Sequence, residues 1–284
     1  MEIINRRQRM FSISRKLRRE SKTVGFVPTM GALHEGHLTL VKEARQMCDV
    51  VIVSIFVNPT QFNSSVDLEK YPRDLTTDVS LLAEYEVDYI FAPEEHEIYP
   101  DGFSTYVNVQ GVTDVLEGES RPGHFRGVAT VVTILLNTVR PDHAFFGQKD
   151  AQQVAVIKRL TTDLGFETEI VVVPTVREES GLAMSSRNER LSAEEREKAA
   201  IIINALRAAK TEFKRGERNA SHLTQIVRDT IATEPLARLD YVHIVDRESM
   251  QTIDKVGDNE ALIVIAAYFG DVRLIDNVIL NRKQ

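Results

Sequence analysis

Residues 50–57 have the sequence VVIVSIFV, an apolar run of strand length that is broken by a single serine. Valine and isoleucine favour extended backbone, and a run without polar alternation is typical of a strand buried on both faces. Such strands occur mainly in parallel sheets that have helices on both sides. This stretch therefore predicts that at least part of the chain folds as an α/β domain.

Shorter apolar runs and amphipathic segments alternate on both sides of this strand. Further strands are predicted at residues 24–27, 88–91, 143–146 and 169–173. Helices are predicted from Gly36, from Asp74, and over residues 128–139 and 152–164. This alternation, with right-handed crossovers, predicts an open, doubly wound parallel sheet of Rossmann type.

The pattern changes after Pro174. Two helices are predicted at residues 192–214 and 221–233, followed by strands at 240–245, 261–269 and 272–279. Residues 269–272, FGDV, indicate a tight hairpin, so this smaller sheet should be at least partly antiparallel. We expect a Rossmann-like domain over residues 1–176 and a smaller α+β domain over residues 177–284.

Composition and charge argue against several broad classes of protein. The chain has 284 residues, which is ample for a buried core, and no apolar run long enough to span a bilayer. Its basic N-terminal segment lacks the apolar stretch of a signal peptide, so a helix with a charged exposed face is expected there. The single cysteine, Cys48, excludes an intramolecular disulfide and favours a reducing, cytoplasmic location. A net charge of −7 gives no general attraction to nucleic acid.

Four polar stretches follow four of the predicted strands. They cover residues 28–37, 58–63, 147–153 and 176–188. In an open parallel sheet the carboxyl ends of the strands face one edge, and ligands bind there. We therefore expect these stretches to meet, although they lie far apart in the sequence.

The first polar stretch, PTMGALHEGH over residues 28–37, has the composition of a phosphate-binding turn. Its glycines allow close approach of the backbone to a phosphate, and the N-terminus of the following helix adds partial positive charge. His34 and His37 are three residues apart, so they point the same way and can donate to phosphate oxygens. The spacing does not fit a zinc-protease motif, and His37-Leu38 replaces the Lys-Ser/Thr of a P-loop. Two structural loop histidines are the alternative.

Two further stretches carry cations that suit a phosphate. Lys149 is the first cation after an apolar strand, although an ordinary surface lysine is the alternative. Residues 184–187, MSSR, combine two hydroxyls with a guanidinium fork. A helix cap is the other interpretation, but Ser192 with Glu195 has capping-box spacing and supplies that cap. Ser185, Ser186 and Arg187 are therefore available for another role.

Gln61 and Gln153 also lie on the predicted ligand edge. An amide can hold a hydroxyl or a carboxylate without cancelling its charge, so a bound carboxylate keeps its nucleophilic character. Ordinary surface glutamines are an equally good interpretation of both residues.

At this point the motifs resemble those of a known family. Residues 28–37 are similar to the HIGH motif of the adenylyl-transferring superfamily, and residues 184–188, MSSRN, to its KMSKS motif. The motifs FVNPTQF (56–62), GHFRGV (123–128) and FFGQKD (145–150) occur between them. Together they make nearly the whole chain resemble the pantothenate synthetase, or pantoate–β-alanine ligase, family.

The resemblance implies a two-step reaction. Pantoate would attack the α-phosphorus of ATP to give pantoyl-adenylate and pyrophosphate, and β-alanine would then displace AMP. The resemblance also implies a requirement for Mg²⁺ and a cytoplasmic homodimer. Residues 1–176 would be the catalytic domain that binds ATP and pantoate, and residues 177–284 would be a lid. No nucleic acid or membrane partner is expected.

Roles for individual residues follow from the same resemblance. The catalytic residues would be His37, with His34 beside it, and Lys149. Gln61 and Gln153 would bind pantoate, and Gln61 would also contact β-alanine. The ATP site would be formed by Met30, Gly31, Ala32, Leu33, His34, Glu35, Gly36, His37, Gly147, Gln148, Lys149, Asp150, Val176, Met184, Ser185, Ser186 and Arg187. The metal ligands are not identified.

Three other functions fit parts of this pattern. A nucleotidylyltransferase would need further Arg or Lys residues for a phosphorylated acceptor, and Gln61 and Gln153 argue against that. An aminoacyl-tRNA synthetase would need a basic RNA-binding surface, which a net charge of −7 does not suggest. A non-catalytic nucleotide sensor would bind ATP without releasing pyrophosphate.

Overall fold

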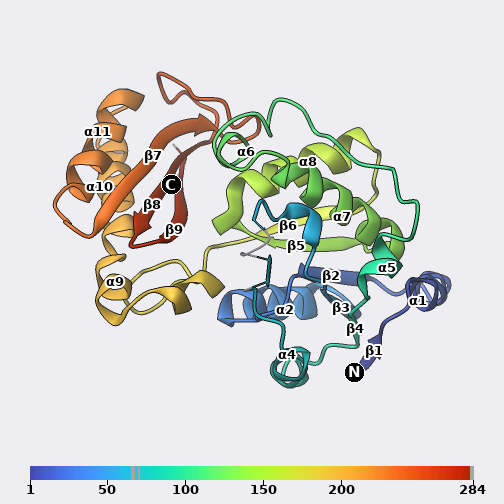
Figure 1. Cartoon of the computed structure of the whole chain (residues 1–284). Helices are drawn as coiled ribbons and strands as arrows, with labels where there is room; N and C mark the ends of the chain where they lie inside the picture. The colour runs from blue at the N-terminus through green and yellow to red at the C-terminus, as the bar shows by residue number, and fades with distance from the viewer. Residues whose placement is uncertain (65–67, 70, 282–284) are drawn as a thin grey trace. The chain divides into compact units, whose positions relative to one another are not determined.

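Figure 1 shows a computed structural model of the chain, which describes residues 1–64, 68–69 and 71–281. The chain forms two compact units. The first comprises residues 1–147 and 152–174, and the second comprises residues 148–151 and 175–284. Residues 148–151 thus belong to the second unit, although their sequence neighbours on both sides belong to the first.

The first unit contains a six-stranded sheet in the order β1-β4-β3-β2-β5-β6, and every neighbouring pair is parallel. Its strands are β1 (Glu2–Ile4), β2 (Val24–Thr29), β3 (Val50–Ile55), β4 (Tyr89–Phe91), β5 (His143–Gly147) and β6 (Glu169–Val173). The predicted parallel α/β sheet is confirmed. The sequence pattern misses only β1, whose three residues are too few to show a period.

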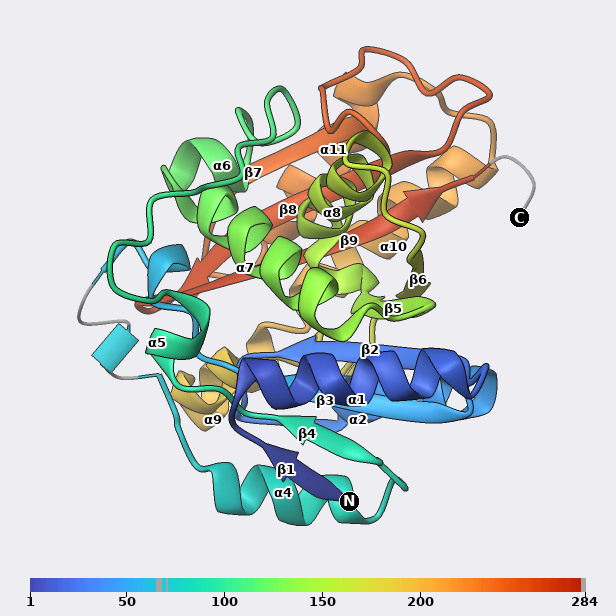
Figure 2. The same cartoon turned by 90° about the vertical axis from the view of Figure 1, so that its right-hand side faces the viewer.

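Helices cover both faces of this sheet. Up to residue 163 they are α1 (Arg7–Arg19), α2 (Glu35–Met47), α4 (Leu75–Ala83), α5 (Glu95–Ile98), α6 (Glu117–Ser120), α7 (His124–Val139) and α8 (Ala151–Asp163). Val41 of α2 and Leu82 of α4 pack in one buried cluster with Val53 and Phe145 of the strands. Figures 1 and 2 show α7 and α8 on the other side of β2 and β5 from α2 and α4. The predicted N-terminal helix is confirmed as α1, which buries Met10, Ile13 and Leu17.

The strand order brings four strand ends together at one edge of the sheet. The chain runs from β2 outward to β3 and β4, and later adds β5 and β6 on the other side of β2. The order therefore reverses between β2 and β5, and doubly wound sheets bind ligands at such a point. The four polar stretches begin at the carboxyl ends of β2, β3, β5 and β6, which are consecutive in the sheet, as the topological argument predicts.

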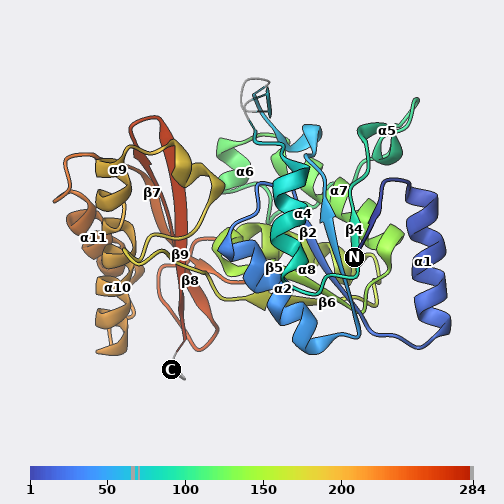
Figure 3. The same cartoon turned by 90° about the horizontal axis from the view of Figure 1, so that it is seen from below.

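Within its described residues, the second unit combines a small sheet with three α-helices. Its strands β7 (Ala237–Asp246), β8 (Ala261–Phe269) and β9 (Val272–Leu280) are antiparallel in the order β7-β8-β9. Its helices are α9 (Ala193–Lys198), α10 (Ile201–Lys214) and α11 (Ala220–Ile231). Figures 1 and 3 show α10 and α11 side by side along one face of the sheet. Leu206 and Leu223 of these helices share a core with Ile263 and Ile265 of β8.

The predicted hairpin between the last two strands is confirmed. Phe269 pairs with Val272, which leaves Gly270 and Asp271 as the two-residue turn. Gly270 has a φ of +53°, in the left-handed region that glycine adopts without strain. This turn makes β8 and β9 antiparallel, as expected for part of the smaller sheet.

The single helix predicted over residues 192–214 is wrong. The structure has two helices, which are separated by a turn at Ala199 and Ala200. The next residues, Ile201-Ile202-Ile203, are β-branched and lose side-chain freedom in a helix, which weakens the helix at that point. Ala199 is fully buried, so tertiary packing fixes the turn.

The length and apolarity of a helix decide whether it could span a membrane. A helix that crosses a bilayer needs about 20 mostly apolar residues. Across residues 1–64, 68–69 and 71–281, none of the helices is both long and apolar enough to do so.

Candidate active site

The loop that joins β2 to α2 has an unusual backbone. Gly31 and Ala32 have φ angles of +81° and +51°, both in the left-handed region. A Cβ atom on Gly31 would lie 2.8 Å from Oδ2 of Asp78 and 3.2 Å from a methyl group of Ile55. Position 31 therefore needs glycine for two reasons, the backbone angle and the close approach of Asp78.

Asp78 of α4 holds this loop in place. Its side chain is buried, its Oδ2 accepts the Ala32 N–H at 3.1 Å, and its Oδ1 accepts the Leu33 N–H at 2.8 Å. Burial raises the pKa of Asp78, while the two N–H donors act in the opposite direction. The motifs of the sequence do not point to this residue. The signal was present, because an acidic side chain four residues before the fully buried Leu82 lies on a core-facing side of its helix, where it needs partners.

Two imidazole rings stand at the start of α2. His34 is the N-cap, and its Nδ1 accepts the Gly36 N–H at 3.1 Å. Nδ1 of His37 accepts the His34 N–H at 3.4 Å, and the two ring centroids lie 4.1 Å apart. Because each Nδ1 accepts a hydrogen bond, the proton of each neutral ring sits on Nε2, which is then a donor. Imidazole N–H donors and the positive end of the helix dipole thus lie at one point, which suits an anionic phosphate.

The stretch after β3 brings Gln61 to the same loop. Gln61 lies in the short 3-10 turn η1 (Pro59–Gln61), is 8% exposed, and donates from Nε2 to the sulfur of Met30. Its Oε1 accepts from Nδ2 of Asn58 at 3.0 Å. Its main-chain carbonyl accepts from Nδ1 of His124 at 2.8 Å. The first two polar stretches therefore meet through Gln61 and Met30, and Asn58 and His124 support that contact.

The two neighbouring glutamines of α8 differ in their surroundings. Gln152 is 5% exposed, donates to the carbonyls of Val112 and Val115, and accepts the Glu117 N–H at 3.0 Å. Gln153 is half-buried, and its side chain makes no hydrogen bond within the described part of the chain. Gln152 is therefore structural, and Gln153 is the one of the pair whose amide can turn to a ligand.

Lys149 lies in a second 3-10 turn, η2 (Gln148–Asp150), which belongs to the second unit. Its side chain is 17% exposed, and Nζ lies 3.7 Å from Oδ1 of Asp150. Asn277 of β9 anchors the turn. Its Nδ2 donates to the carbonyls of Gln148 and Lys149 at 2.9 and 3.0 Å, and its Oδ1 accepts from Nε2 of Gln148 at 2.9 Å. The side chain of Gln148 therefore has a structural role, and Asn277 is a supporting residue that the sequence did not reveal.

The segment that leads into the KMSKS-like motif forms a closed loop within the second unit. The Met184 N–H donates to the Val176 carbonyl at 3.0 Å, so residues 176–184 form a closed loop. Arg177 fixes this loop by a bidentate ion pair with Asp276 of β9, at 2.6 and 3.0 Å. Asp276 is 4% exposed, so the pair is well shielded from water.

Ser185 caps the short turn that follows it, while the next helix has its own cap. The Ser192–Glu195 capping box at the start of α9 is confirmed, with bonds of 3.2 and 2.8 Å. Ser185 also has a capping role of its own, at a different turn. Ser185 Oγ accepts the Arg187 N–H at 3.2 Å and caps the 3-10 turn η3 (Ser186–Arg190). A hydroxyl that accepts can still donate its own hydrogen, so Ser185 keeps the ability to bind a phosphate.

The described residues contain no group of three or more His, Cys, Asp or Glu side chains arranged to hold a metal ion. Mg²⁺ commonly takes most of its ligands from substrate phosphates and water, with one or two carboxylates from the protein.

Comparisons with known proteins identify one family. A family model described as Pantoate-beta-alanine ligase matches residues 2–279. The pantothenate synthetase of Heliobacterium modesticaldum is 52% identical over 281 residues, which are 99% of this chain and 100% of the relative. The pantothenate synthetase of Carboxydothermus hydrogenoformans is 54% identical over 265 residues, 93% of each chain.

Solved structures agree with the sequence comparisons. A pantothenate synthetase from Thermus thermophilus matches with a TM-score of 0.92 and 44% identity, covering 99% of this chain and 100% of its own. A pantoate-beta-alanine ligase from Francisella tularensis, complexed with Beta-gamma ATP and Beta-alanine, matches with a TM-score of 0.81 and 41% identity over 99% of this chain and 98% of its own. With a family model that spans nearly its whole length and relatives of about half identical sequence, this chain belongs to the pantoate–β-alanine ligase family.

Proposed function

We propose that this ligase works in two steps at the carboxyl edge of its parallel sheet. In the first step a carboxylate oxygen of pantoate attacks the α-phosphorus of ATP, and pyrophosphate leaves. In the second step the neutral amine of β-alanine attacks the carbonyl carbon of the adenylate, AMP leaves, and the nitrogen loses a proton. The products are pantothenate, AMP and pyrophosphate.

The start of α2 is the observation that carries this proposal. The Nδ1 atoms of His34 and His37 accept backbone N–H groups, so each neutral ring offers its Nε2–H as a donor. Displacement at phosphorus spreads negative charge over the phosphate oxygens and the leaving pyrophosphate. Fixed donors at a helix N-terminus stabilise that charge without rearranging during the reaction.

The proposed nucleotide site combines this loop with three other segments. We assign ATP binding to residues 30–37, Gly147 with residues 148–150, Val176, and residues 184–187. His37, His34 and Lys149 would be the catalytic residues. The Lys149 side chain is 17% exposed, and partial burial strengthens the attraction of its charge to a phosphate.

Gln61 and Gln153 are the proposed contacts to pantoate, and Gln61 is also the proposed contact to β-alanine. Both side chains are neutral, so they can orient the pantoate carboxylate without forming an ion pair that would blunt its attack. The buried position of Gln61 and its contact with Met30 support its assignment beside the nucleotide loop.

Other features of the proposal concern the whole enzyme. An acyl-adenylate reacts with water, so we propose that residues 177–284 act as a lid over the catalytic domain of residues 1–176. Mg²⁺ carried by the nucleotide would shield the charge of the β- and γ-phosphates. We also propose that the enzyme is a homodimer and works in the cytoplasm, which its single cysteine favours.

Isotope exchange tests the two-step reaction. With pantoate and ATP but no amine, the enzyme should exchange labelled pyrophosphate into ATP, because the first step is reversible. Adding β-alanine should then discharge the intermediate to pantothenate and AMP. ADP and phosphate as products would indicate an acyl-phosphate route instead. Exchange with a phosphorylated acceptor but not with pantoate would indicate a nucleotidylyltransferase, and ATP binding without exchange would indicate a sensor.

A further inference from the structure

A buried hydrogen-bond network surrounds Asn58, which follows β3 and is 1% exposed. Its amide nitrogen donates to the carbonyl of Gly127 at 3.2 Å and to Oε1 of Gln61 at 3.0 Å. Its amide oxygen accepts from the hydroxyl of Tyr99 at 2.7 Å and from the hydroxyl of Thr60 at 2.9 Å. All four hydrogen-bonding positions of the Asn58 amide are therefore filled.

The Gly127 carbonyl shows which end of the Asn58 amide is its nitrogen. A carbonyl oxygen can only accept, so the atom that faces it must be the NH₂ group. Gly127 also lets α7 approach the turn η1 closely, because a Cβ atom at that position would lie 2.4 Å from the carbonyl oxygen of Thr60. The oxygen of Asn58 therefore faces the two hydroxyls, and its nitrogen faces Gln61.

The direction of the Gln61 amide follows from that of Asn58. Gln61 must turn its oxygen toward the Asn58 nitrogen, which directs its own nitrogen to Met30. The Met30 sulfur is a weak acceptor. A hydroxyl or carboxylate oxygen of a ligand is a stronger acceptor, so it can take the place of the sulfur at little cost.

Tyr99 is well suited to hold the Asn58 amide in this orientation. Its ring packs against Phe56 and Phe103, with centroids 6.2 and 5.0 Å away, so its hydroxyl has little freedom. Burial raises the pKa of Tyr99 to about 12, so the hydroxyl keeps its proton and remains a donor at neutral pH. Thr60, the other donor to Asn58, is exposed to solvent.

We propose that Tyr99 is a positioning residue for pantoate, whose hydroxyl acts through Asn58 to direct the Nε2–H donors of Gln61 at the substrate. The inference rests on the proposed contact between Gln61 and pantoate. It specifies which partner donates in that contact. Gln61 then offers only N–H donors, so it selects an acceptor oxygen of the substrate. A substrate group that can only donate is disfavoured at this position.

The first test is Tyr99→Phe, which removes the hydroxyl and keeps the packed ring. Loss of one neutral hydrogen bond should raise KM for pantoate about three- to tenfold, while KM for ATP and the melting temperature change little. Tyr106→Phe is the matched control, because Tyr106 packs on Phe103 with centroids 5.4 Å apart and is 44% exposed. That variant should behave as wild type.

A double-mutant cycle separates positioning from a general structural effect. If Tyr99 acts through Gln61, adding Tyr99→Phe to Gln61→Ala should cause no further rise in KM for pantoate, because the amide that it directs is already absent. If the two effects multiply, or if Tyr99→Phe alone leaves this KM unchanged while Gln61→Ala raises it, the positioning role is wrong. An unchanged KM in Gln61→Ala would instead refute the proposed contact between Gln61 and pantoate.

Discussion

Each histidine at the start of α2 uses its two ring nitrogens differently. Nδ1 of His37 accepts the His34 N–H, and Nδ1 of His34 accepts the Gly36 N–H, so both rings help to cap the helix. The same bonds leave the proton of each neutral ring on Nε2. The cap and the proposed catalytic role therefore depend on the same side chains, and a substitution that tests one role must preserve the other.

His37→Ala and His37→Asn together separate these roles. Loss of one donor to the transition state should cost about 2–4 kcal/mol in adenylate formation for both variants. Only the alanine variant should also lose about 1 kcal/mol of folding stability, because asparagine can still accept the His34 N–H. Single-turnover adenylate formation and denaturant unfolding measure the two quantities. If His37→Asn formed adenylate at the wild-type rate, the Nε2–H of His37 would not be the donor.

Local spacing revealed the histidine pair but not the residues that support it. His34 and His37 are three residues apart, so one helical turn brings them together. Asp78 reaches the Ala32 N–H across 46 residues, and Tyr99 reaches Asn58 across 41. Contacts of that range depend on strand order and register, which the pattern of a single sequence does not provide.

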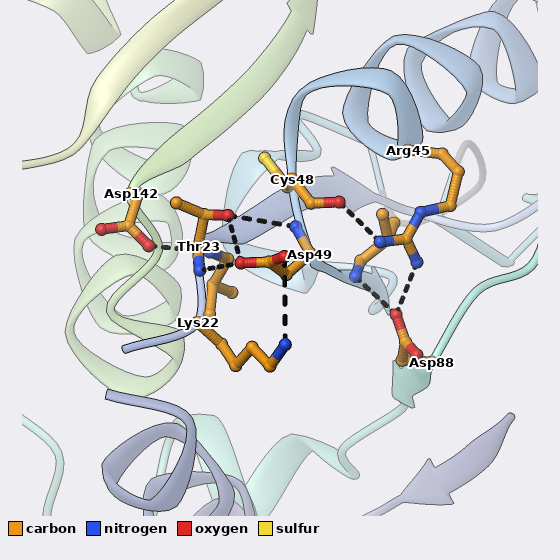
Figure 4. A network of polar contacts seen from close by, with 9 residues as sticks. Lys22, Thr23, Arg45, Cys48, Asp49, Asp88 and Asp142 are labelled. Carbon is orange, nitrogen blue, oxygen red and sulfur yellow. Dashed lines mark hydrogen bonds and ion pairs between the residues drawn. The ribbon is translucent and has the colours of Figure 1, made fainter. Parts of the chain in front are cut away.

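At the scale of elements, three strands of the parallel sheet are each preceded by an aspartate. Figure 4 shows the hydrogen bonds of these aspartates. Asp49, Asp88 and Asp142 directly precede β3, β4 and β5. Their carboxylates accept N–H groups from the neighbouring chain segment, namely Thr23 at 2.9 Å, Val51 at 2.8 Å and Val24 at 2.7 Å. These bonds fix the register of adjacent parallel strands at the amino edge, opposite the candidate active site. The register at the amino edge also determines where each loop at the carboxyl edge begins along the strand direction.

Asp49 makes this arrangement sensitive to pH. The N–H and the hydroxyl of Thr23 lower the pKa of the Asp49 carboxyl in the folded chain. The ionised carboxylate therefore contributes stability that is complete above its unfolded pKa of about 4 and is lost as the pH falls through the folded pKa. The stability advantage of wild type over Asp49→Asn should be present at pH 7 and should shrink toward pH 3.

Denaturant unfolding at several pH values measures this advantage. Asp101→Asn is the matched control, because Asp101 is exposed and makes no side-chain hydrogen bond or ion pair in the described part of the chain. Its effect on stability should be small throughout. An advantage of Asp49 that stayed constant from pH 7 to pH 3 would show that the carboxylate charge is not what fixes Thr23.

Elements with a clear period were the ones that the sequence predicted well. The buried run that forms β3, the hairpin between β8 and β9, and the amphipathic helices follow from periodicity and turn chemistry. The three residues of β1 and the 3-10 turns η1 and η2 are too short to carry a period. The break at Ala199 and Ala200 has no glycine or proline to mark it, and the burial of Ala199 fixes it.

At the scale of the whole molecule, the chain passes between its two units three times. The passages are at residues 147/148, 151/152 and 174/175. The short segment between the first two passages contains Lys149, and Asn277 ties it to β9 across 129 residues. The sequence motif FFGQKD is continuous, but its last residues fold with a strand near the C-terminus. No local pattern could have predicted that.

Asn277→Ala tests how far Lys149 depends on this anchor. The change leaves the buried amide of Gln148 and the carbonyls of Gln148 and Lys149 without their partner, which should cost about 1–3 kcal/mol of folding stability. Since η2 is then held less firmly, KM for ATP should rise and pantoate-dependent pyrophosphate exchange should slow, measured per folded enzyme. Asn281→Ala is the control, because Asn281 follows the same strand but bonds to Glu260. Suppose instead that Asn277→Ala lost stability and still exchanged pyrophosphate at the wild-type rate. In that case the position of Lys149 would not depend on β9, and Asn277 would act only in folding.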